Sequence, residues 1–154
     1  MQIHLKRGEK IYVNGAVLRI DRRASLEFLN NVNFLLENHV IQAEEANTPI
    51  RQLYFVVQTM LIDPENSGVT LQLYRHLHHR LIQATQTPVL VDPLKAIEAS
   101  VEAGRYFDAL KQLRGLFGPE AELLHGNRQE ATAITEEEEH AGITGVAHPT
   151  RLGR

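Results

Sequence analysis

The sequence predicts an α+β fold in which a small N-terminal antiparallel β region is followed by a helical bundle of about four helices. Residues 1–46 contain short apolar runs that alternate with polar residues and are separated by turn-forming residues, a pattern typical of antiparallel strands. Residues 47–118 instead carry apolar residues at helical spacing behind recognisable start signals. Strands and helices do not alternate along the chain, so a parallel sheet is not expected.

The strongest local signal in the β region is a hairpin centred on Asn14 and Gly15. Asn-Gly is the preferred pair for a two-residue type I′ turn, because both central residues need a positive φ. The turn fixes the register, so that Lys10 faces Arg19 and Tyr12 shares their face of the hairpin. The other face is apolar, and we expect it to point into the core. Its residues are Ile11, Val13, Ala16, Leu18 and Ile20.

The chain offers further short strands on both sides of this hairpin. Ile3 and Leu5 alternate in a first strand, and two more strands are expected over residues 25–29 and 34–36. Four or five short strands with close turns favour a β-meander or a small, partly closed barrel. Such a sheet leaves edge strands unpaired, so a homo-oligomer formed through the sheet edges is compatible with the fold.

Proline-containing caps mark the starts of helices in the second region. Thr48 precedes Pro49, which places an N-cap hydroxyl before a proline at the first helical position, and Asp92 precedes Pro93 in the same way. Gly104 is expected to end the third helix. The four helices are expected to begin at Pro49, near Val69, at Asp92-Pro93 and at Tyr106. The predicted buried stripe of the second helix is Leu73, Tyr74, Leu77, Leu81 and Ala84.

Charge is distributed unevenly along the chain, although its net charge is only −3. Residues 1–25 carry six basic and two acidic residues, a net +4, whereas residues 119–154 carry three basic and seven acidic residues, a net −4. Helical periodicity ends after residue 118. The expected organisation is therefore an N-terminal antiparallel β region at 1–46, a helical region at 47–118 and an acidic, disordered tail at 119–154.

Several functional classes are not expected. The chain has no cysteine, which excludes disulfides, thiolate zinc sites and a cysteine nucleophile. It has no apolar run near the ~20 residues that span a bilayer and no secretory signal, so a cytoplasmic protein without membrane contact is expected. Phosphate-binding loops and catalytic motifs are missing, so we expect no enzyme and no cofactor. His76 and His79 lie three residues apart, but no third or fourth ligand joins them, so no metal site is expected.

The predicted hairpin contains a local electrostatic conflict. Lys10 and Arg19 are like charges directly opposite each other on a strand pair, which is destabilising unless something compensates. One interpretation is that Glu9 or Asp21 neutralises the pair. The other is that an anionic ligand binds there, with Tyr12 between the two cations available to stack on an unpaired base. The residues alone leave both interpretations open.

Six short segments stand out in order along the chain. They are LKRGEK at 5–10, NGAV at 14–17, DRR at 21–23, TPIRQLYF at 48–55, DP at 63–64 and VEAGRYFDAL at 101–110. Together they resemble the FlbT family of regulators, which control bacterial flagellin synthesis after transcription, over about residues 1–116. The chain departs from the family pattern at Gln52, where the family usually has a basic residue, and in the added tail from Pro119.

The resemblance implies an RNA-binding post-transcriptional regulator, most often a repressor. Such a regulator binds the 5′ untranslated region of flagellin mRNA and affects its translation and decay. Cations for phosphate and an aromatic surface for bases would come mainly from the β region, with one further arginine beside the first helix. The expected RNA-binding residues are Lys6, Arg7, Lys10, Tyr12, Arg19, Arg22, Arg23 and Arg51.

An alternative is a protein-binding adaptor of flagellar assembly, in which the helical region contacts flagellin, a flagellin chaperone or another flagellar regulator. Exposed apolar residues on a second face of a helix would favour this alternative. The candidates are Leu71 and Ile82, which flank the main stripe of the second predicted helix.

Overall fold

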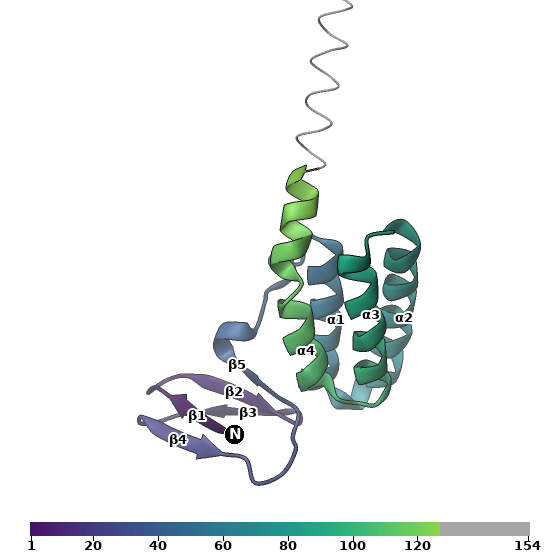
Figure 1. The fold of residues 1–154 in the computed structure, drawn as a ribbon. Helices are drawn as coiled ribbons and strands as arrows, with labels where there is room; N and C mark the ends of the chain where they lie inside the picture. Colours follow the sequence, from purple (N-terminus) through teal and green to yellow (C-terminus); the bar gives the residue numbers. More distant parts are fainter. Residues whose placement is uncertain (127–154) are drawn as a thin grey trace, which may run out of the picture. The chain divides into compact units, whose positions relative to one another are not determined.

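The structure, a computed structural model, describes residues 1–126. A first compact unit spans Met1–Phe117, and in it the strands come first and the helices follow, which confirms the α+β fold class (Figure 1). The strands are β1 (Gln2–Leu5), β2 (Lys10–Val13), β3 (Ala16–Arg19), β4 (Ala24–Glu27) and β5 (Phe34–Leu36). They form two small antiparallel sheets, one in the order β1-β4 and one in the order β3-β2-β5.

β2 and β3 form the predicted hairpin in the predicted register. Asn14 and Gly15 have φ angles of 46° and 87°, the positive values that a type I′ turn requires. Gly15 is also closely packed, because a Cβ added there would lie 3.1 Å from Cδ of Pro64. The hairpin tip therefore lies beside the 3-10 turn η3 (Pro64–Asn66), which follows the first helix α1 (Pro49–Ile62).

The core of the β region is a cluster to which both sheets contribute. Its buried residues are Ile3, Leu5, Ile11 and Phe34. The predicted core face of the hairpin is only partly correct: Ile11 is buried and Val13 and Ile20 are half-buried, but Ala16 and Leu18 are exposed. The prediction for these last two residues is wrong because β3 is an edge strand, and all four of its residues are exposed in the described structure.

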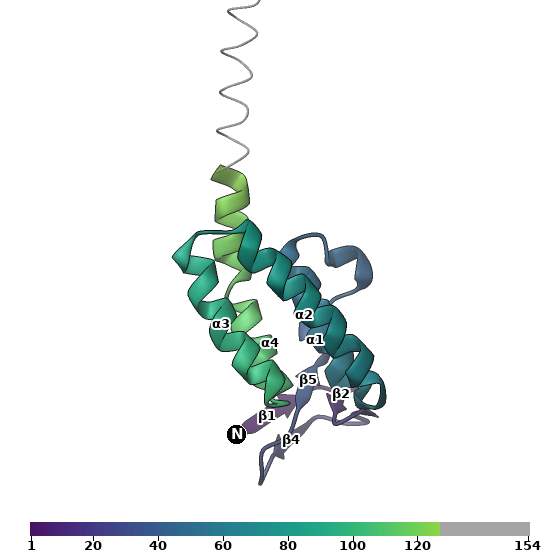
Figure 2. The ribbon, with the colours of Figure 1, turned by 90° about the vertical axis from the view of Figure 1, so that its right-hand side faces the viewer.

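α1 is followed by three further helices, α2 (Ser67–Ala84), α3 (Pro88–Glu102) and α4 (Tyr106–Arg114). Consecutive helices run in opposite directions, and the sheets lie at the end of the bundle where α1 ends and α2 begins (Figures 1 and 2). α1 packs against both α2 and α4, so Ile50, Leu53 and Val57 are completely buried. Within residues 1–126, no helix combines the length and apolar character needed to cross a membrane.

The predicted N-cap of α1 is confirmed. The Oγ1 of Thr48 accepts a hydrogen bond from the backbone N–H of Arg51 at 3.2 Å, and Pro49 occupies the first turn. The N-cap thus satisfies one of the backbone N–H groups that the first turn of a helix leaves without an internal partner.

The buried face of α2 differs from the predicted stripe. Tyr74 is fully buried as expected, but Leu73 and Ala84 are exposed, while His78 is buried. The Nε2 of His78 donates a hydrogen bond to the carbonyl oxygen of Leu94 in α3 at 2.8 Å. This tertiary contact satisfies a polar side chain in the interior, so α2 is rotated toward His78 rather than toward its leucine-rich side.

α3 begins five residues before the predicted start. Thr87 and Pro88 repeat the Thr-Pro arrangement that opens α1, and Pro93 lies inside the helix. Pro93 has no backbone N–H, so the carbonyl of Val89 lacks its usual donor within the helix. The helix ends as expected, because Gly104 has a φ of 73°.

The predicted acidic tail at 119–154 lies mostly outside the described residues, which end at 126. Residues 117–126 are helical, so helical structure continues past the predicted boundary at 118. Pro119 is compatible with this helix because it lies in the first turn, where a backbone N–H has no intrahelical partner.

Candidate nucleic-acid interface

Six of the eight predicted binding residues gather at one corner of the β region. Two turns run side by side there: the N–H of Gly8 donates to the carbonyl of Ile20 at 2.7 Å, and the N–H of Ile20 donates to the carbonyl of Glu9 at 2.9 Å. The first turn joins β1 to β2 and the second joins β3 to β4, at the end of the hairpin where Lys10 faces Arg19. We call this group of cations the basic corner: Lys6, Arg7, Lys10, Arg19, Arg22 and Arg23.

The centre of the basic corner is the cross-strand pair of Lys10 and Arg19. Arg19 is exposed and Lys10 is half-buried. Among residues 1–126, neither side chain forms an ion pair with a carboxylate. The like charges that the sequence predicts to face each other therefore do so without direct neutralisation.

The carboxylates at the basic corner contact other groups. Glu9 accepts a hydrogen bond from the backbone N–H of Lys6 at 3.0 Å, and Asp21 lies 3.9 Å from the Nε of Arg22. Glu37 accepts a hydrogen bond from the backbone N–H of Lys10 at 3.0 Å. Sequence reasoning missed this third carboxylate because it lies 27 residues further along the chain. Three carboxylates against six cations leave the basic corner with a net charge of +3.

Tyr12 lies on the same face of β2 as Lys10 but is half-buried. Its neighbour across the ladder is Leu35 of β5, which is only 2% exposed. α1 packs against β2, so we infer that it covers this face near β5 and leaves it open near β3, where Val17 is 58% exposed. Tyr12 therefore lies at the border between a covered and an open surface, and only part of its side chain is available for stacking.

Arg51 lies apart from the basic corner. It is in the first turn of α1, at the end of the helical bundle that lies away from the sheets (Figure 1). Its guanidinium carbon lies 4.2 Å from the centroid of the Phe117 ring, which is a cation–π contact. The structure thus places Arg51 in the packing between α1 and the segment that follows α4.

A hydrogen-bonded network connects α1 and α4 to the 3-10 turn η1 (Glu37–His39). The hydroxyl of Tyr54 donates to the carbonyl of His39 at 2.5 Å, and the Nη1 of Arg114 donates to that hydroxyl at 3.0 Å. Burial raises the pKa of Tyr54, an effect that Arg114 partly offsets. Burial and, secondarily, the charge of Arg114 lower the pKa of His39 below 6.5. The network holds η1, and with it Glu37, against the helices.

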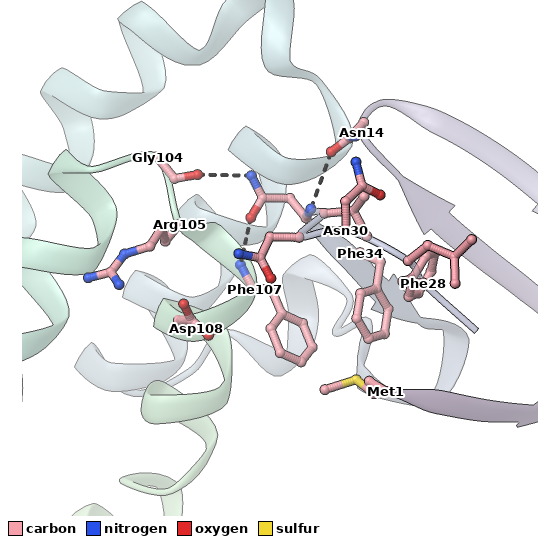
Figure 3. A pocket seen from close by; sticks show the side chains of 13 residues that line it. Met1, Asn14, Phe28, Asn30, Phe34, Gly104, Arg105, Phe107 and Asp108 are labelled. Atoms are coloured by element: carbon pink, nitrogen blue, oxygen red, sulfur yellow. Dashed lines mark hydrogen bonds between the residues drawn. The ribbon is translucent and has the colours of Figure 1, made fainter. Parts of the chain in front are cut away.

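An open cavity of about 550 Å³ lies between the loop that joins β4 to β5 and the turn between α3 and α4 (Figure 3). Asn33 connects its two sides, because its Nδ2 donates to the carbonyl of Gly104 at 2.9 Å and its Oδ1 accepts from the N–H of Phe107 at 3.1 Å. The asparagine-rich segment 30–33 is typical of a turn in the sequence. Three amide side chains within four residues were the available signal for a polar site.

The histidines of α2 do not form a metal site with other side chains of the described structure. His76 and His79 are exposed. No group of three or more histidine, cysteine or acidic side chains within residues 1–126 is arranged to hold a metal ion.

Comparisons with known proteins match nearly the whole described chain. A family model with the description "Flagellar protein FlbT" matches residues 1–124. A "probable flagellum biosynthesis repressor protein FlbT" of Allorhizobium ampelinum is 51% identical over 138 residues, which cover 90% of this chain and 91% of the relative. Proteins with the same description from Rhizobium johnstonii and Chelativorans sp. are each 47% identical, over 87% and 86% of this chain and 90% and 92% of the relatives. No solved structure matches.

Proposed function

This chain belongs to the FlbT family of flagellar proteins, and on that premise we propose that it represses flagellin synthesis by binding flagellin mRNA. Its site would be the 5′ untranslated region of the message, and its action would reduce translation and promote decay. The names of the relatives support a repressor of flagellum biosynthesis. In this proposal the protein is a cytoplasmic regulator rather than an enzyme, and it needs neither a cofactor nor a membrane.

The observation that carries the proposal is the basic corner. RNA affinity depends first on cations that replace the counterions of the phosphate backbone. Lys10 and Arg19 face each other without a carboxylate on either side chain among residues 1–126, and the two adjoining turns add four more cations. A phosphate between Lys10 and Arg19 would remove the repulsion that the hairpin otherwise contains.

The geometry of the basic corner favours binding to the phosphates of the RNA rather than to its bases. Its cations come from two turns and from the paired ends of β2 and β3, and all of them except Lys10 are exposed. Contacts of this type position a nucleic acid through its phosphates and do not specify its bases. Sequence preference must then come from a second surface of the protein.

The proposal is tested with a matched pair of double charge reversals in the full-length protein. Lys10→Glu with Arg19→Glu should weaken binding to a labelled flagellin 5′ untranslated RNA by at least about tenfold, because two phosphate contacts become repulsive. Arg80→Glu with Lys95→Glu changes the net charge equally, on exposed cations of α2 and α3, and should leave binding nearly unchanged. Equal loss in both variants, or no loss in either, would contradict a site at the basic corner.

The same variants can be read in cells through a reporter that carries the flagellin 5′ untranslated region. The Lys10 and Arg19 double variant should raise reporter synthesis, while the Arg80 and Lys95 double variant should repress like the unmodified protein. Loss of RNA binding without loss of repression would mean that repression does not require RNA binding at the basic corner.

A second candidate function is favoured by an apolar surface on α2. Val69 and Leu73 are four residues apart on this helix and are 79% and 49% exposed, whereas the expected candidates Leu71 and Ile82 are half-buried. Such a surface suits a protein partner, and in this alternative the partner is flagellin, a flagellin chaperone or another flagellar regulator. A pull-down read for both RNA and protein, repeated with Val69→Lys and Leu73→Lys, separates the two functions.

A homo-oligomer formed through a sheet edge is also part of the proposal. β3 is the outer strand of its sheet, and Val17 and Leu18 on it are 58% and 44% exposed. An exposed, apolar edge strand can pair with the same strand of a second copy. Light scattering should then give a dimer mass that Leu18→Lys reduces to that of a monomer, whereas a monomer at all concentrations would exclude pairing.

A further inference from the structure

The cavity between the β4–β5 loop and the α3–α4 turn has an aromatic side that consists of three phenylalanine rings. The ring centroids of Phe28 and Phe34 are 4.8 Å apart, and those of Phe34 and Phe107 are 4.5 Å apart in a stacked arrangement (Figure 3). Phe34 is buried, while Phe28 and Phe107 are half-buried and line the cavity. A planar ligand that entered the cavity would therefore meet aromatic surface, as unpaired bases do in single-stranded RNA complexes.

Amide side chains line the cavity from the loop between β4 and β5 and from the turn between β2 and β3. Asn14 and Asn33 are held by hydrogen bonds within the protein. Asn30 and Asn31 also line the cavity, are exposed, and have no hydrogen-bond partner among the described residues. An amide offers both donors and an acceptor, which is the combination that the edge of a nucleobase requires.

The charge of the cavity distinguishes it from the basic corner. Arg105 and Asp108 are the two lining residues with charged side chains, and these charges cancel; Met1, which also lines the cavity, carries the N-terminal ammonium group. The basic corner carries a net +3, so phosphate groups are favoured there and not in the cavity. A planar ligand with hydrogen-bonding edges fits the cavity, whereas the phosphate groups fit the basic corner.

The two surfaces lie at opposite ends of the same strand. β2 begins with Lys10 in the basic corner, and the chain reaches Asn14 at the cavity four residues later, about 13 Å away at the usual rise of a strand. A single-stranded RNA held by its phosphates at the basic corner can therefore extend to the cavity within a few nucleotides.

We propose that the cavity between the β4–β5 loop and the α3–α4 turn binds an unpaired base of the RNA whose phosphates lie at the basic corner. This inference rests on the proposed function, and it supplies the base contact that the basic corner lacks. Asn30 and Asn31 would bind the edge of the base, and one face of the base would lie against the aromatic side of the cavity.

The test compares the full-length protein with Asn30→Ala plus Asn31→Ala, which alters exposed loop residues without touching Asn33. Affinity for the flagellin 5′ untranslated RNA should fall about tenfold, because two hydrogen bonds are lost. The dependence of affinity on salt should stay unchanged, because no phosphate contact is removed. Asn38→Ala with Asn47→Ala, at exposed asparagines outside the cavity, is the control and should bind normally.

A second measurement uses uridine, cytidine, adenosine and guanosine as probes, since these nucleosides lack phosphate. Saturable shifts of the Asn30 and Asn31 side-chain amide signals by nuclear magnetic resonance are expected with at least one of them. Normal RNA affinity in the Asn30 and Asn31 variant, or nucleoside shifts only outside the cavity, would overturn the base site and leave the basic corner standing. Absence of RNA binding by the unmodified protein would overturn both proposals.

Discussion

Lys10 and Arg19 lie directly opposite each other across the β2–β3 ladder, and neither side chain has a carboxylate partner among residues 1–126. A like-charged cross-strand pair is destabilising, whereas an opposite-charge pair contributes about 0.2–1 kcal/mol of stability. The protein therefore retains an arrangement that disfavours its own folding at the place where an anion would bind. Two consequences of this arrangement, for folding and for RNA binding, can be measured separately.

The first prediction is that one substitution changes stability and RNA binding in opposite directions. Arg19→Glu places a carboxylate opposite Lys10, so the free energy of unfolding should rise by up to about 1 kcal/mol. RNA affinity should fall at the same time, because a phosphate contact is lost. Urea unfolding and RNA titration measure the two effects. Arg22→Glu, at an exposed turn residue, should weaken RNA binding without stabilising the fold.

Asn33 is the subject of the second prediction. Its amide binds both the carbonyl of Gly104 and the N–H of Phe107, more than 70 residues away. Asn33→Ala would leave both backbone groups without these partners at a half-buried site, so the free energy of unfolding should fall by about 1–3 kcal/mol. Asn38→Ala, at an exposed residue, should change it by less than about 0.5 kcal/mol. Similar effects of the two substitutions in urea unfolding would contradict the role of Asn33.

A third prediction concerns the tip of the hairpin. Gly15 and Gly8 both have a φ of 87°, but only Gly15 has neighbouring atoms within 4 Å of an added Cβ. Gly8→Ala should cost about 1 kcal/mol for the left-handed conformation alone. Gly15→Ala should cost more, because the Cβ would also lie 3.1 Å from Pro64. Thermal unfolding of the two variants checks this order, and a larger loss at Gly8 would contradict the packing of the tip against η3.

His39 predicts a dependence of stability on pH. Its pKa is lowered in the folded protein by burial and by Arg114, so the unfolded chain binds a proton more readily. Protonation of His39 should therefore not reduce the free energy of unfolding above pH 6.5. As the pH falls through 6.5 toward the pKa of His39 in the folded protein, that free energy should decrease. The midpoint of urea unfolding at several pH values measures this effect. His39→Asn should flatten the dependence, whereas His76→Gln, at an exposed residue, should not.

Features that depend on neighbouring residues in the sequence could be predicted. The Asn14-Gly15 turn sets the register of β2 and β3 through backbone conformation alone, and the observed register is the predicted one. The cap of α1 by Thr48 is equally local. The basic corner follows from these local features, because a fixed hairpin register places Lys10 opposite Arg19 and brings the flanking turns together.

Features that depend on distant residues could not be predicted. Leu18 alternates like a core residue, but β3 is an edge strand, so nothing in the described structure buries it. α2 buries His78, whose side chain contacts the carbonyl of Leu94 in α3. The spacing of apolar residues along α2 gives no information about this contact with another helix. The cavity lies where Asn33 contacts the carbonyl of Gly104. An asparagine-rich turn in the sequence does not indicate which distant residue it will contact.

The central claim, that the basic corner binds RNA phosphates, is tested most directly by the salt dependence of binding to the flagellin 5′ untranslated RNA. For single strands, each phosphate contact contributes about −0.7 to the slope of log affinity against log salt concentration. The slope should therefore become less negative by about 1.4 in the Lys10→Glu and Arg19→Glu double variant, with no change for Arg80→Glu and Lys95→Glu. An unchanged slope and affinity in the Lys10 and Arg19 variant would contradict the account and place the RNA elsewhere on the protein.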